Sequence, residues 1–174
     1  MMNFEKRALG RTSLEVTAFG LGCATMGGHR IPVTRAEAEA IVRAAWAAGV
    51  RYVDTAPYYG FGQAERCVGD ALRAVPRDEW VLSTKVGRLL GPHAKEPAGE
   101  TPQSPMPFDA VFDYSYDAIM RSLEDSLRSC PRAWCKSGVA FALSGGFGRC
   151  CQAAAAGSLK IGSSLNGAIV SSVM

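Results

Sequence analysis

Three residues whose side chains can hold or move a proton follow short apolar runs of this sequence. Asp54 comes directly after Arg51-Tyr52-Val53, and Lys85 lies near the end of the run Trp80 to Val86. Tyr59 follows Asp54, beyond a turn that a proline fixes. Runs rich in β-branched and aromatic residues favour strands. The C-terminal ends of the strands of a parallel α/β barrel converge on one face, where chemistry is done. We therefore expect Asp54, Tyr59 and Lys85 to form one proton-handling site.

The spacing of these residues follows a specific pattern. The sequence D-T-A-x-x-Y-G-x-x-x-x-E spans Asp54 to Glu65, and S-T-K ends at Lys85. In this pattern the chain resembles the aldo-keto reductase family, from Arg7 to Arg128. The resemblance implies a site of Asp, Tyr, Lys and His, of which the first three match Asp54, Tyr59 and Lys85. The His ends the next strand in the family, and we find no counterpart here. We interpret Glu65 as a structural residue that bonds nearby backbone amides.

Further short patterns narrow the resemblance. S-T-K-V-G-R at 83–88, F-D-Y-S-Y-D at 112–117 and M-R-S-L-E-D-S-L at 120–127 resemble bacterial sugar and pyridoxal dehydrogenases within that family. The resemblance implies NAD(P)-dependent interconversion of a carbonyl, or lactol, and an alcohol on a small sugar-like or aldehyde substrate. It also implies a substrate-side loop at 87–107, a Pro-rich stretch whose length is typical of a functional loop. The identity of the substrate, the choice between NAD and NADP, and the oligomeric state stay open.

The chemistry of carbonyl reduction suits these residue types. Reduction needs a hydride and a proton, and a nicotinamide cofactor must supply the hydride because no side chain donates one. A tyrosine can donate the proton, but the pKa of a free phenol is about 10, and a nearby ammonium lowers it. We therefore assign Tyr59 as the general acid, or as the base in the oxidation direction. Lys85 is its electrostatic partner, and Asp54 is the anchor that keeps Lys85 charged.

The candidate cofactor residues lie earlier in the chain. The stretch 18–24 is typical of a first barrel strand, and its two glycines indicate that another group approaches closely. The resemblance puts Gly22, Cys23 and Ala24 near the nicotinamide end of NADP or NAD, together with Asp54. Many relatives have Thr where Cys23 stands. A tight strand-to-loop turn is the alternative explanation of the glycines.

The elements that must position these residues alternate between strand and helix. Two short runs around Gly10 predict a β-hairpin, which family members carry at the N-terminal end of the barrel. Helices are predicted from a capping box at Thr34 to a stop at Gly49, over 64–72 and over 116–127. Short connections between alternating strands and helices predict parallel strands with right-handed crossovers. The expected fold is α/β, an incomplete TIM (β/α)8 barrel with an N-terminal hairpin and about three βα units.

Length and composition limit the alternatives. The chain has 174 residues, 48% of them hydrophobic, which allows one sizeable core but falls short of the ~250 residues of a complete barrel. A net charge of +3 without a Lys- or Arg-rich run gives no support for a nucleic-acid partner. The sequence has neither the h-region of a signal peptide nor a run of about 18 apolar residues, so we expect no membrane association. Only Cys23 and Cys67 occur in the first 125 residues, which suits the reducing cytoplasm.

The composition changes sharply near residue 128. All sixteen Asp and Glu lie at or before Asp125, whereas the remainder from Arg128 onward carries five Lys and Arg. Four of the six cysteines also fall in this part, which is rich in Ser, Gly and Ala and has no sustained period. We therefore divide the chain into 1–128, the N-terminal part of the barrel, and 129–174, an atypical tail that is not native to the fold.

Other residues that can bind a ligand are poorly placed for it. His29 and His93 lie among Gly or Pro residues, and we interpret them as surface histidines. Cys150-Cys151 lacks the CxxC spacing, and Cys130 and Cys135 have no matched pair of further ligands. We expect no metal site.

Two alternatives to an active enzyme stay open. The chain is then either a non-catalytic product of truncation or frameshift, or a binding module that kept the fold for protein contacts. A cofactor titration tests the first, and a pull-down tests the second. We expect no NAD(P)H oxidation, since the tetrad His and the basic residues that hold the adenosine phosphate in the family are missing. We also expect poor solubility, because three strands cannot close a barrel, and few contacts between the tail and 1–128.

Overall fold

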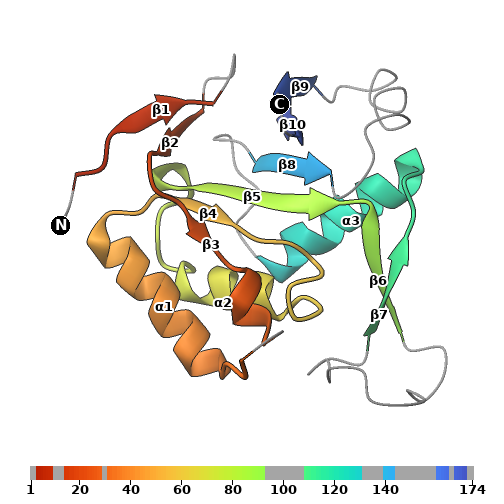
Figure 1. Ribbon diagram of the computed structural model, residues 1–174, viewed down its shortest axis with the longest axis horizontal. Coiled ribbons are helices and arrows are strands. Elements are labelled where there is room, and N and C mark those ends of the chain that lie inside the picture. The colour runs from red at the N-terminus through yellow and green to blue at the C-terminus, as the bar shows by residue number, and fades with distance from the viewer. Residues whose placement is uncertain are drawn as a thin grey trace.

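The computed structural model describes residues 3–9, 14–28, 31–92, 108–130, 139–143, 160–164 and 167–171. Its main element is a six-stranded sheet of order β3-β4-β5-β8-β10-β9 (Figure 1). β3, β4, β5 and β8 are parallel, and β10 and β9 continue the sheet antiparallel. The strands in sheet order are β3 (Leu21–Gly22), β4 (Tyr52–Asp54), β5 (Val81–Val86), β8 (Val139–Leu143), β10 (Gly167–Ser171) and β9 (Lys160–Ser164).

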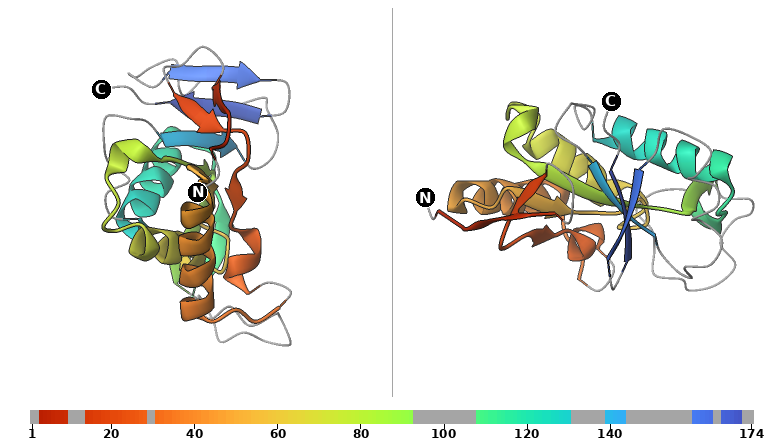
Figure 2. Two further views of the ribbon diagram at one scale, coloured as in Figure 1. Left: turned by 90° about the vertical axis from the view of Figure 1, so that its left-hand side faces the viewer. Right: turned by 90° about the horizontal axis from the view of Figure 1, so that it is seen from above.

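A helix follows each of the first three parallel strands. These helices are α1 (Arg35–Ala48), α2 (Gln63–Ala71) and α3 (Tyr116–Ser129). Seen from above, they lie along one side of the strands (Figure 2). Helices on the crossovers between parallel strands are the repeating unit of an α/β barrel. The predicted fold, an incomplete barrel with three βα units, is confirmed.

Local sequence signals explain where α1 begins and ends. The Thr34 side chain accepts from the backbone N–H of Glu37, and the Glu37 carboxylate accepts in return from the backbone N–H of Thr34 at 2.8 Å. This is the predicted capping box, which satisfies N–H groups that have no partner inside the helix. At the other end Gly49 takes a left-handed conformation with φ 108°, which a glycine adopts at little cost.

The hairpin expected around Gly10 is also present. β1 (Lys6–Ala8) pairs antiparallel with β2 (Glu15–Thr17). The Thr17 hydroxyl accepts a hydrogen bond from the backbone N–H of Arg51 at 3.1 Å, and Arg51 directly precedes β4. The hairpin therefore contacts the N-terminal end of the central strands, away from the ends that carry Asp54 and Lys85.

One hydrophobic core fills the space between the strands and the helices. The core is completed by the 3-10 turn η1 (Ala24–Gly27), which packs on α2. Apolar side chains of the strands and of the helices meet in this core, so the core fixes the register of each strand relative to its neighbour. Its fully buried members include Cys23, Met26, Ala38, Val42, Val53, Ala64, Cys67, Val68, Leu82 and Cys130.

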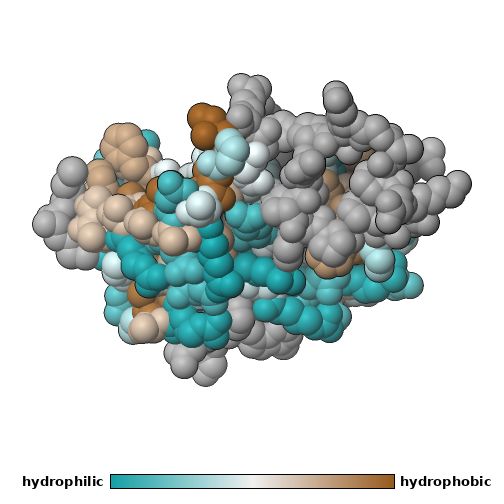
Figure 3. Space-filling view, turned by 90° about the horizontal axis from the view of Figure 1, so that it is seen from below, coloured by the Kyte–Doolittle hydropathy of each residue, from teal (hydrophilic) through white to brown (hydrophobic). Residues whose placement is uncertain are grey.

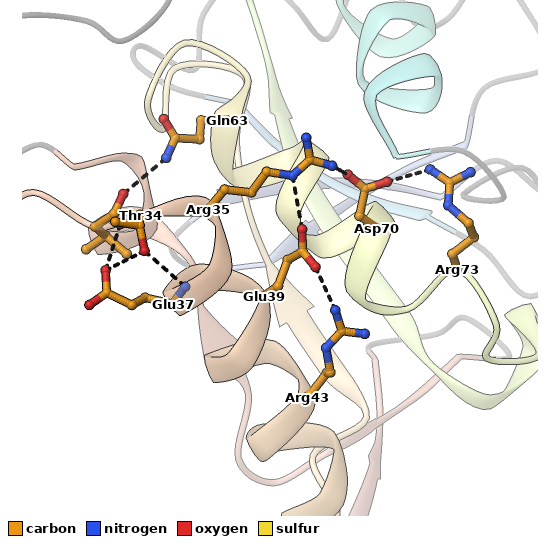
Figure 4. A network of polar contacts seen from close by, with 9 residues as sticks. Thr34, Arg35, Glu37, Glu39, Arg43, Gln63, Asp70 and Arg73 are labelled. Atoms are coloured by element: carbon orange, nitrogen blue, oxygen red, sulfur yellow. Dashed lines mark hydrogen bonds and ion pairs between the residues drawn. The ribbon is translucent and has the colours of Figure 1, made fainter.

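Charged residues join α1 to α2 at the surface. Arg35 pairs with Glu39 on its own helix and with Asp70 on α2, while Arg43 and Arg73 each pair with one of these carboxylates (Figure 4). These arginines are more than half exposed, so each pair contributes little to stability. In the space-filling view from below, most of the coloured surface is hydrophilic (Figure 3).

The structure differs from the sequence-based expectation at two places before residue 128. The predicted first strand, 18–24, is a strand only over Leu21–Gly22. The predicted loop after Lys85 begins instead with β6 (Arg88–Pro92), which pairs antiparallel with β7 (Phe108–Phe112). Aromatic and β-branched residues in β7 favour this ribbon. Residues 93–107 lie outside the described residues.

The expectation that the tail makes few contacts with the rest of the chain is wrong. β8 pairs with β5 over five residues, from Leu82 opposite Val139 to Val86 opposite Leu143. The physical reason is the edge of β5, whose backbone N–H and C=O groups need partners wherever water is excluded. The run V-A-F-A-L has the composition of a strand. It was not predicted because the sequence around it shows no sustained period.

Candidate active site

The predicted carboxylate and ammonium meet at the C-terminal ends of β4 and β5. Lys85 Nζ donates to Asp54 Oδ2 at 2.9 Å and to the backbone carbonyl of Thr55 at 3.1 Å. The other oxygen of the Asp54 carboxylate accepts from Ser83 Oγ at 2.6 Å. Both carboxylate oxygens are therefore engaged, and the carboxylate is held in one orientation.

Tyr59 lies beside this ion pair. Lys85 Nζ is 4.8 Å from the centroid of the Tyr59 ring. Burial by itself lowers the pKa of Lys85, but hydrogen bonds to Asp54 and Tyr59 and the negative charge of Asp54 outweigh it and raise the pKa above its ordinary value. Lys85 is therefore a permanent cation at neutral pH. The ammonium group therefore lies close enough to the Tyr59 ring to stabilise negative charge that develops there during proton transfer.

The alternating directions of side chains in β5 explain the S-T-K sequence. Ser83 and Lys85 both face Asp54, whereas Thr84 points to the opposite side, toward α2. There the Thr84 hydroxyl donates to Glu65 Oε1 at 2.7 Å. The sequence predicted that Glu65 bonds backbone amides. Among the described hydrogen bonds, its carboxylate accepts instead from the Thr84 hydroxyl, across the core. Burial raises the pKa of the Glu65 carboxyl, against the lowering effect of the Thr84 hydroxyl.

Two glycines set the position of the Tyr59 loop. Gly60 has φ 63°, in the left-handed region, and its backbone packs directly on Gly27. A Cβ atom added to Gly27 would lie 2.2 Å from the backbone nitrogen of Gly60, far inside any normal contact. The turn η1 therefore supports the loop from below, and only glycine permits this approach.

The predicted cofactor residues lie next to Asp54. Gly22 is opposite Asp54 in the parallel pairing of β3 with β4, and the backbone N–H of Cys23 donates to the Asp54 carbonyl at 2.9 Å. Gly22 and Ala24 are exposed, and a Cβ atom added to Gly22 would meet nothing within 4 Å. The Cys23 side chain is instead fully buried in the core, which together with the Asp54 charge raises the pKa of its thiol to about 12. Cys23 can therefore offer a ligand only its backbone.

Two polar residues of the site, Ser83 and Tyr52, were not predicted from the sequence. Ser83 holds Asp54, and its hydroxyl is 3.0 Å from the hydroxyl of Tyr52, one strand away. In the pairing of β4 with β5, Asp54 lies opposite Ser83. The sequence signal that could have found them is the period of two, which puts Tyr52 and Asp54 on one face of β4 and Ser83 and Lys85 on the same face of β5.

The remaining candidates of the sequence analysis give no second site. His29 and His93 lie outside the described residues. Within the described ranges, no group of three or more His, Cys, Asp or Glu is placed to hold a metal ion. None of the helices in the described ranges has the length and apolar character needed to cross a membrane.

Fold and site together define a class of protein. Parallel strands with helical crossovers carry an Asp–Lys pair and an adjacent Tyr at their C-terminal ends, the face on which α/β barrels perform chemistry. A comparison with protein families gives the same answer, because the profile of the Aldo/keto reductase family matches residues 18–133. The chain belongs to the aldo/keto reductase family.

Similar curated proteins come from bacteria and plants. The chain is 50% identical over 135 residues to a pyridoxal 4-dehydrogenase of Microbacterium luteolum, covering 70% of this chain and 38% of the relative. It is 43% identical over 99 residues to a D-threo-aldose 1-dehydrogenase of a Pseudomonas species, covering 56% and 30%. An L-galactose dehydrogenase of Arabidopsis thaliana is 34% identical over 129 residues, covering 73% and 34%. The chain thus spans well under half the length of these relatives.

Solved structures of the family resemble the fold. The holo form of an aldo-keto reductase from Bacillus halodurans gives a TM-score of 0.56 at 29% identity, over 74% of this chain and 37% of that structure. A glycerol dehydrogenase from Gluconobacter oxydans gives 0.52 at 26% identity, over 72% and 35%. These neighbours agree with the assignment of the fold to the aldo-keto reductases.

Proposed function

We propose that this chain carries the proton-handling part of an NAD(P)-dependent site that interconverts a carbonyl, or lactol, and an alcohol. The substrate is a small sugar-like or aldehyde molecule. The observation that supports this most directly is Lys85, whose ammonium bonds Asp54 at 2.9 Å and lies 4.8 Å from the ring centroid of Tyr59. An acid, a cation beside it that stabilises the negative charge left after proton transfer, and an anchor for that cation are the groups that proton transfer to a carbonyl oxygen needs.

In reduction, Tyr59 donates its phenolic proton to the carbonyl oxygen as negative charge develops there. Lys85 stabilises the resulting phenolate, and Asp54 keeps Lys85 protonated and in place. Ser83 and the Thr55 carbonyl fix the geometry of this pair, so little reorganisation accompanies proton transfer. In oxidation the same groups act in reverse, with the phenolate of Tyr59 as the base.

The residues near Asp54 are suited to a nicotinamide. Gly22 and Ala24 are exposed, and the open space beside Gly22 would let a planar ring approach the backbone. When bound there, the cofactor would supply the hydride, which no side chain can donate. We assign Gly22, Ala24, Asp54 and the backbone of Cys23 to this contact.

We further propose that the 174-residue chain does not turn over by itself. β8 pairs with β5, where the next barrel strand belongs, and its sequence V-A-F-A-L contains no histidine to orient the substrate carbonyl. The division into 1–128 and 129–174 is part of the same proposal. It is tested by translating the nucleotide sequence around codon 128 in the other frames. A Leu-Gly-Leu-Asp turn followed by a strand that ends in His would support a frameshift.

The decisive experiment compares this chain with a chimera. Residues 1–128 are joined to the C-terminal part of the Microbacterium luteolum relative, and pyridoxal and L-galactose-type substrates are offered in both directions. NADH and NADPH oxidation is followed for carbonyl reduction, and NAD+ and NADP+ reduction for alcohol or lactol oxidation. We expect turnover by the chimera and none by the 174-residue chain. Turnover by the 174-residue chain would disprove its inactivity, and an inactive but folded chimera that binds cofactor would count against the assigned site.

Two tyrosine variants of the chimera make the test specific. Tyr59→Phe should reduce turnover about 10²- to 10⁴-fold, the usual contribution of a general acid, and leave cofactor fluorescence titration unchanged. Tyr116→Phe is the matched control, since it removes the hydroxyl of an exposed tyrosine on α3 and keeps the ring. Equal losses in both variants would contradict the role of Tyr59.

A cytoplasmic location completes the proposal. Cys23, Cys67 and Cys130 are buried free thiols among the described residues. Free thiols stay reduced in a reducing compartment such as the cytoplasm, and we therefore place the chain there.

A further inference from the structure

An arginine is held between two aromatic rings beside the site. The guanidinium carbon of Arg88, the first residue of β6, lies 4.1 Å from the ring centroid of Tyr58 and 4.3 Å from that of Phe112. Phe61 extends this row of rings beyond Tyr58, at 5.1 Å, and Tyr114 extends it beyond Phe112, at 6.5 Å. Cation–π contact with two rings restrains the guanidinium.

Arg88 contacts the same loop as the candidate catalytic lysine. Lys85 lies against Tyr59, and three residues later Arg88 lies against Tyr58. Between them Gly87 turns the chain out of β5 with φ 89°, and a Cβ atom there would lie 2.2 Å from the Tyr114 ring. In Figure 1 the ribbon of β6 and β7 leaves from the C-terminal end of β5. The backbone and the rings therefore fix Arg88 next to the proton-handling residues.

The donors of Arg88 are not used by the part of the chain that the structure describes. Its Nε is buried there and has no hydrogen-bond partner. Its other N–H groups likewise form no hydrogen bond or ion pair within the described ranges. Asp113, an acidic residue just beyond β7, accepts instead from the backbone N–H of Ser115 at 2.9 Å. An arginine carries five N–H donors in a rigid fork, and leaving a buried donor unpaired is costly.

Two functions could explain this arrangement. In the first, Arg88 only holds the ribbon on the Tyr58 loop, a role for which the ring contacts suffice and the donors are irrelevant. In the second, a restrained guanidinium with unused donors beside the candidate site binds the oxygen acceptors of a ligand. Tyr58 and Phe112 are 39% and 58% exposed, which leaves ring surface for the carbon skeleton of the same ligand.

We propose that Arg88 is a specificity-determining residue that donates hydrogen bonds to the hydroxyl oxygens of the substrate, remote from the carbon that reacts. This inference rests on the proposed function and narrows its substrate class to polyhydroxylated aldehydes and lactols. Partial desolvation between the rings strengthens these charge-assisted bonds. The two neighbouring pairs therefore have different roles. Lys85 and Tyr59 act at the reacting carbon, whereas Arg88 and Tyr58 recognise the rest of the molecule.

The test measures binding to the full 174-residue chain, so it does not require turnover. The probes are L-galactose and 2-hydroxytetrahydropyran, which share the lactol ring and differ in the remaining hydroxyls. We expect the wild-type chain to bind L-galactose at least tenfold more tightly. Arg88→Met removes the charged donors and should weaken L-galactose binding about 10- to 100-fold, with the second probe unchanged. Arg88→Lys keeps a positive charge but loses the planar fork that the rings hold, so it should also weaken L-galactose binding. Arg43→Gln, a surface arginine on α1, is the matched control.

A second measurement uses the wild-type chain alone, so it does not depend on whether a variant folds. The Nε–H signal of Arg88 in nitrogen-15 NMR should move when L-galactose is added and stay in place with 2-hydroxytetrahydropyran. The proposal is overturned if the wild-type chain shows no saturable binding of L-galactose or if the Arg88 variants bind it as tightly as wild type. It is also overturned if inorganic phosphate, and not L-galactose, depends on Arg88, since the fork would then bind anions.

Failure of this inference can be told apart from failure of the proposed function. In the chimera, Tyr59→Phe tests the proton donor through the loss of turnover, and Arg88→Met tests recognition through the dissociation constant of L-galactose. A chimera that turns over while Arg88→Met changes neither binding nor kcat/KM for L-galactose refutes only the role of Arg88. A folded chimera that does not turn over but whose L-galactose binding depends on Arg88 refutes the catalytic assignment and leaves the recognition role standing.

Discussion

Asp54 and Lys85 lie on adjacent parallel strands and are joined by a 2.9 Å contact between Oδ2 and Nζ. Their side chains are 35% and 24% exposed, so the pair is neither a surface contact nor fully excluded from water. Asp54 ends β4, and Lys85 comes two residues after the Ser83 that faces Asp54 in the pairing of the strands. The contact therefore depends on the register of β4 and β5, which the core on the opposite face sets.

Replacing Asp54 with Asn should lower the pKa of Lys85. The substitution keeps the shape of the side chain and removes the charge, which leaves burial as the main influence on the lysine. The titration of the lysine ε-methylene groups by carbon-13 NMR measures this. Asp70→Asn is the matched control, because Asp70 pairs with Arg35 and Arg73 on the helices. An unchanged Lys85 titration in Asp54→Asn would show that the ion pair does not form.

The same pair should appear in the alkaline pH dependence of stability. A lysine whose pKa is raised in the folded state stabilises that state fully below its unfolded pKa of about 10.4, and the contribution is lost as pH rises through the folded value. Wild type should therefore exceed Asp54→Asn in unfolding free energy at pH 7, and the difference should shrink above pH ~10.4. Urea unfolding across this range provides the measurement. A difference independent of pH would assign the effect to packing.

Gly27→Ala should destabilise the protein, whereas Gly22→Ala should not. A Cβ atom at Gly27 would lie 2.2 Å from the Gly60 nitrogen, and one at Gly22 would meet nothing within 4 Å. Because the clash is with backbone, the cost should reach at least the ~1–3 kcal/mol typical of overpacking. Urea unfolding tests both variants. Gly22→Ala should instead weaken cofactor binding in the chimera, and equal stability losses in the two variants would contradict this arrangement.

Much of this molecule was predictable because local signals agree with the tertiary structure. Thr34 and Glu37 form the expected capping box, and the C-terminal ends of β4 and β5 bring Asp54 and Lys85 together as expected. Ser83 escaped attention because a serine in a strand is unremarkable until its neighbour across the sheet is known. The aromatic row at Arg88 also could not be predicted, since it joins a loop to a ribbon whose pairing is separated by 15 residues outside the described ranges.

Replacing Glu65 with Gln should make the protein relatively more stable as pH rises. Burial raises the pKa of the carboxyl in the folded state, so its favourable protonated form is present below the unfolded pKa of about 4.3 and the contribution is lost as pH rises. Glutamine keeps an oxygen for the Thr84 hydroxyl and does not ionise. Urea unfolding between pH 4 and pH 8 should show a growing advantage of Glu65→Gln over wild type.

A second variant separates charge from hydrogen bonding at this position. Thr84→Val removes the donor to Glu65 Oε1 and keeps the volume, so it should cost about 1–3 kcal/mol at neutral pH. The loss of unfolding free energy should be smaller in the Glu65→Gln background, because leaving a neutral buried acceptor without a donor costs less than leaving a charged one. Additive losses in the double variant would mean that the two side chains do not interact.

The last prediction concerns the part of the chain after residue 138. β8 supplies backbone partners along β5, and β10 pairs with β8 on its far side. A chain that ends at residue 143 should keep the amide protection of β5, whereas a chain that ends at residue 138 should lose it. The reason is that the edge of β5 would then face water or another molecule. Hydrogen exchange of the β5 amides compares the two truncations directly, with the β4 amides as internal reference. Equal protection of β5 in both truncations would show that β8 does not pair with it in solution and would restore the expectation of a tail that makes few contacts.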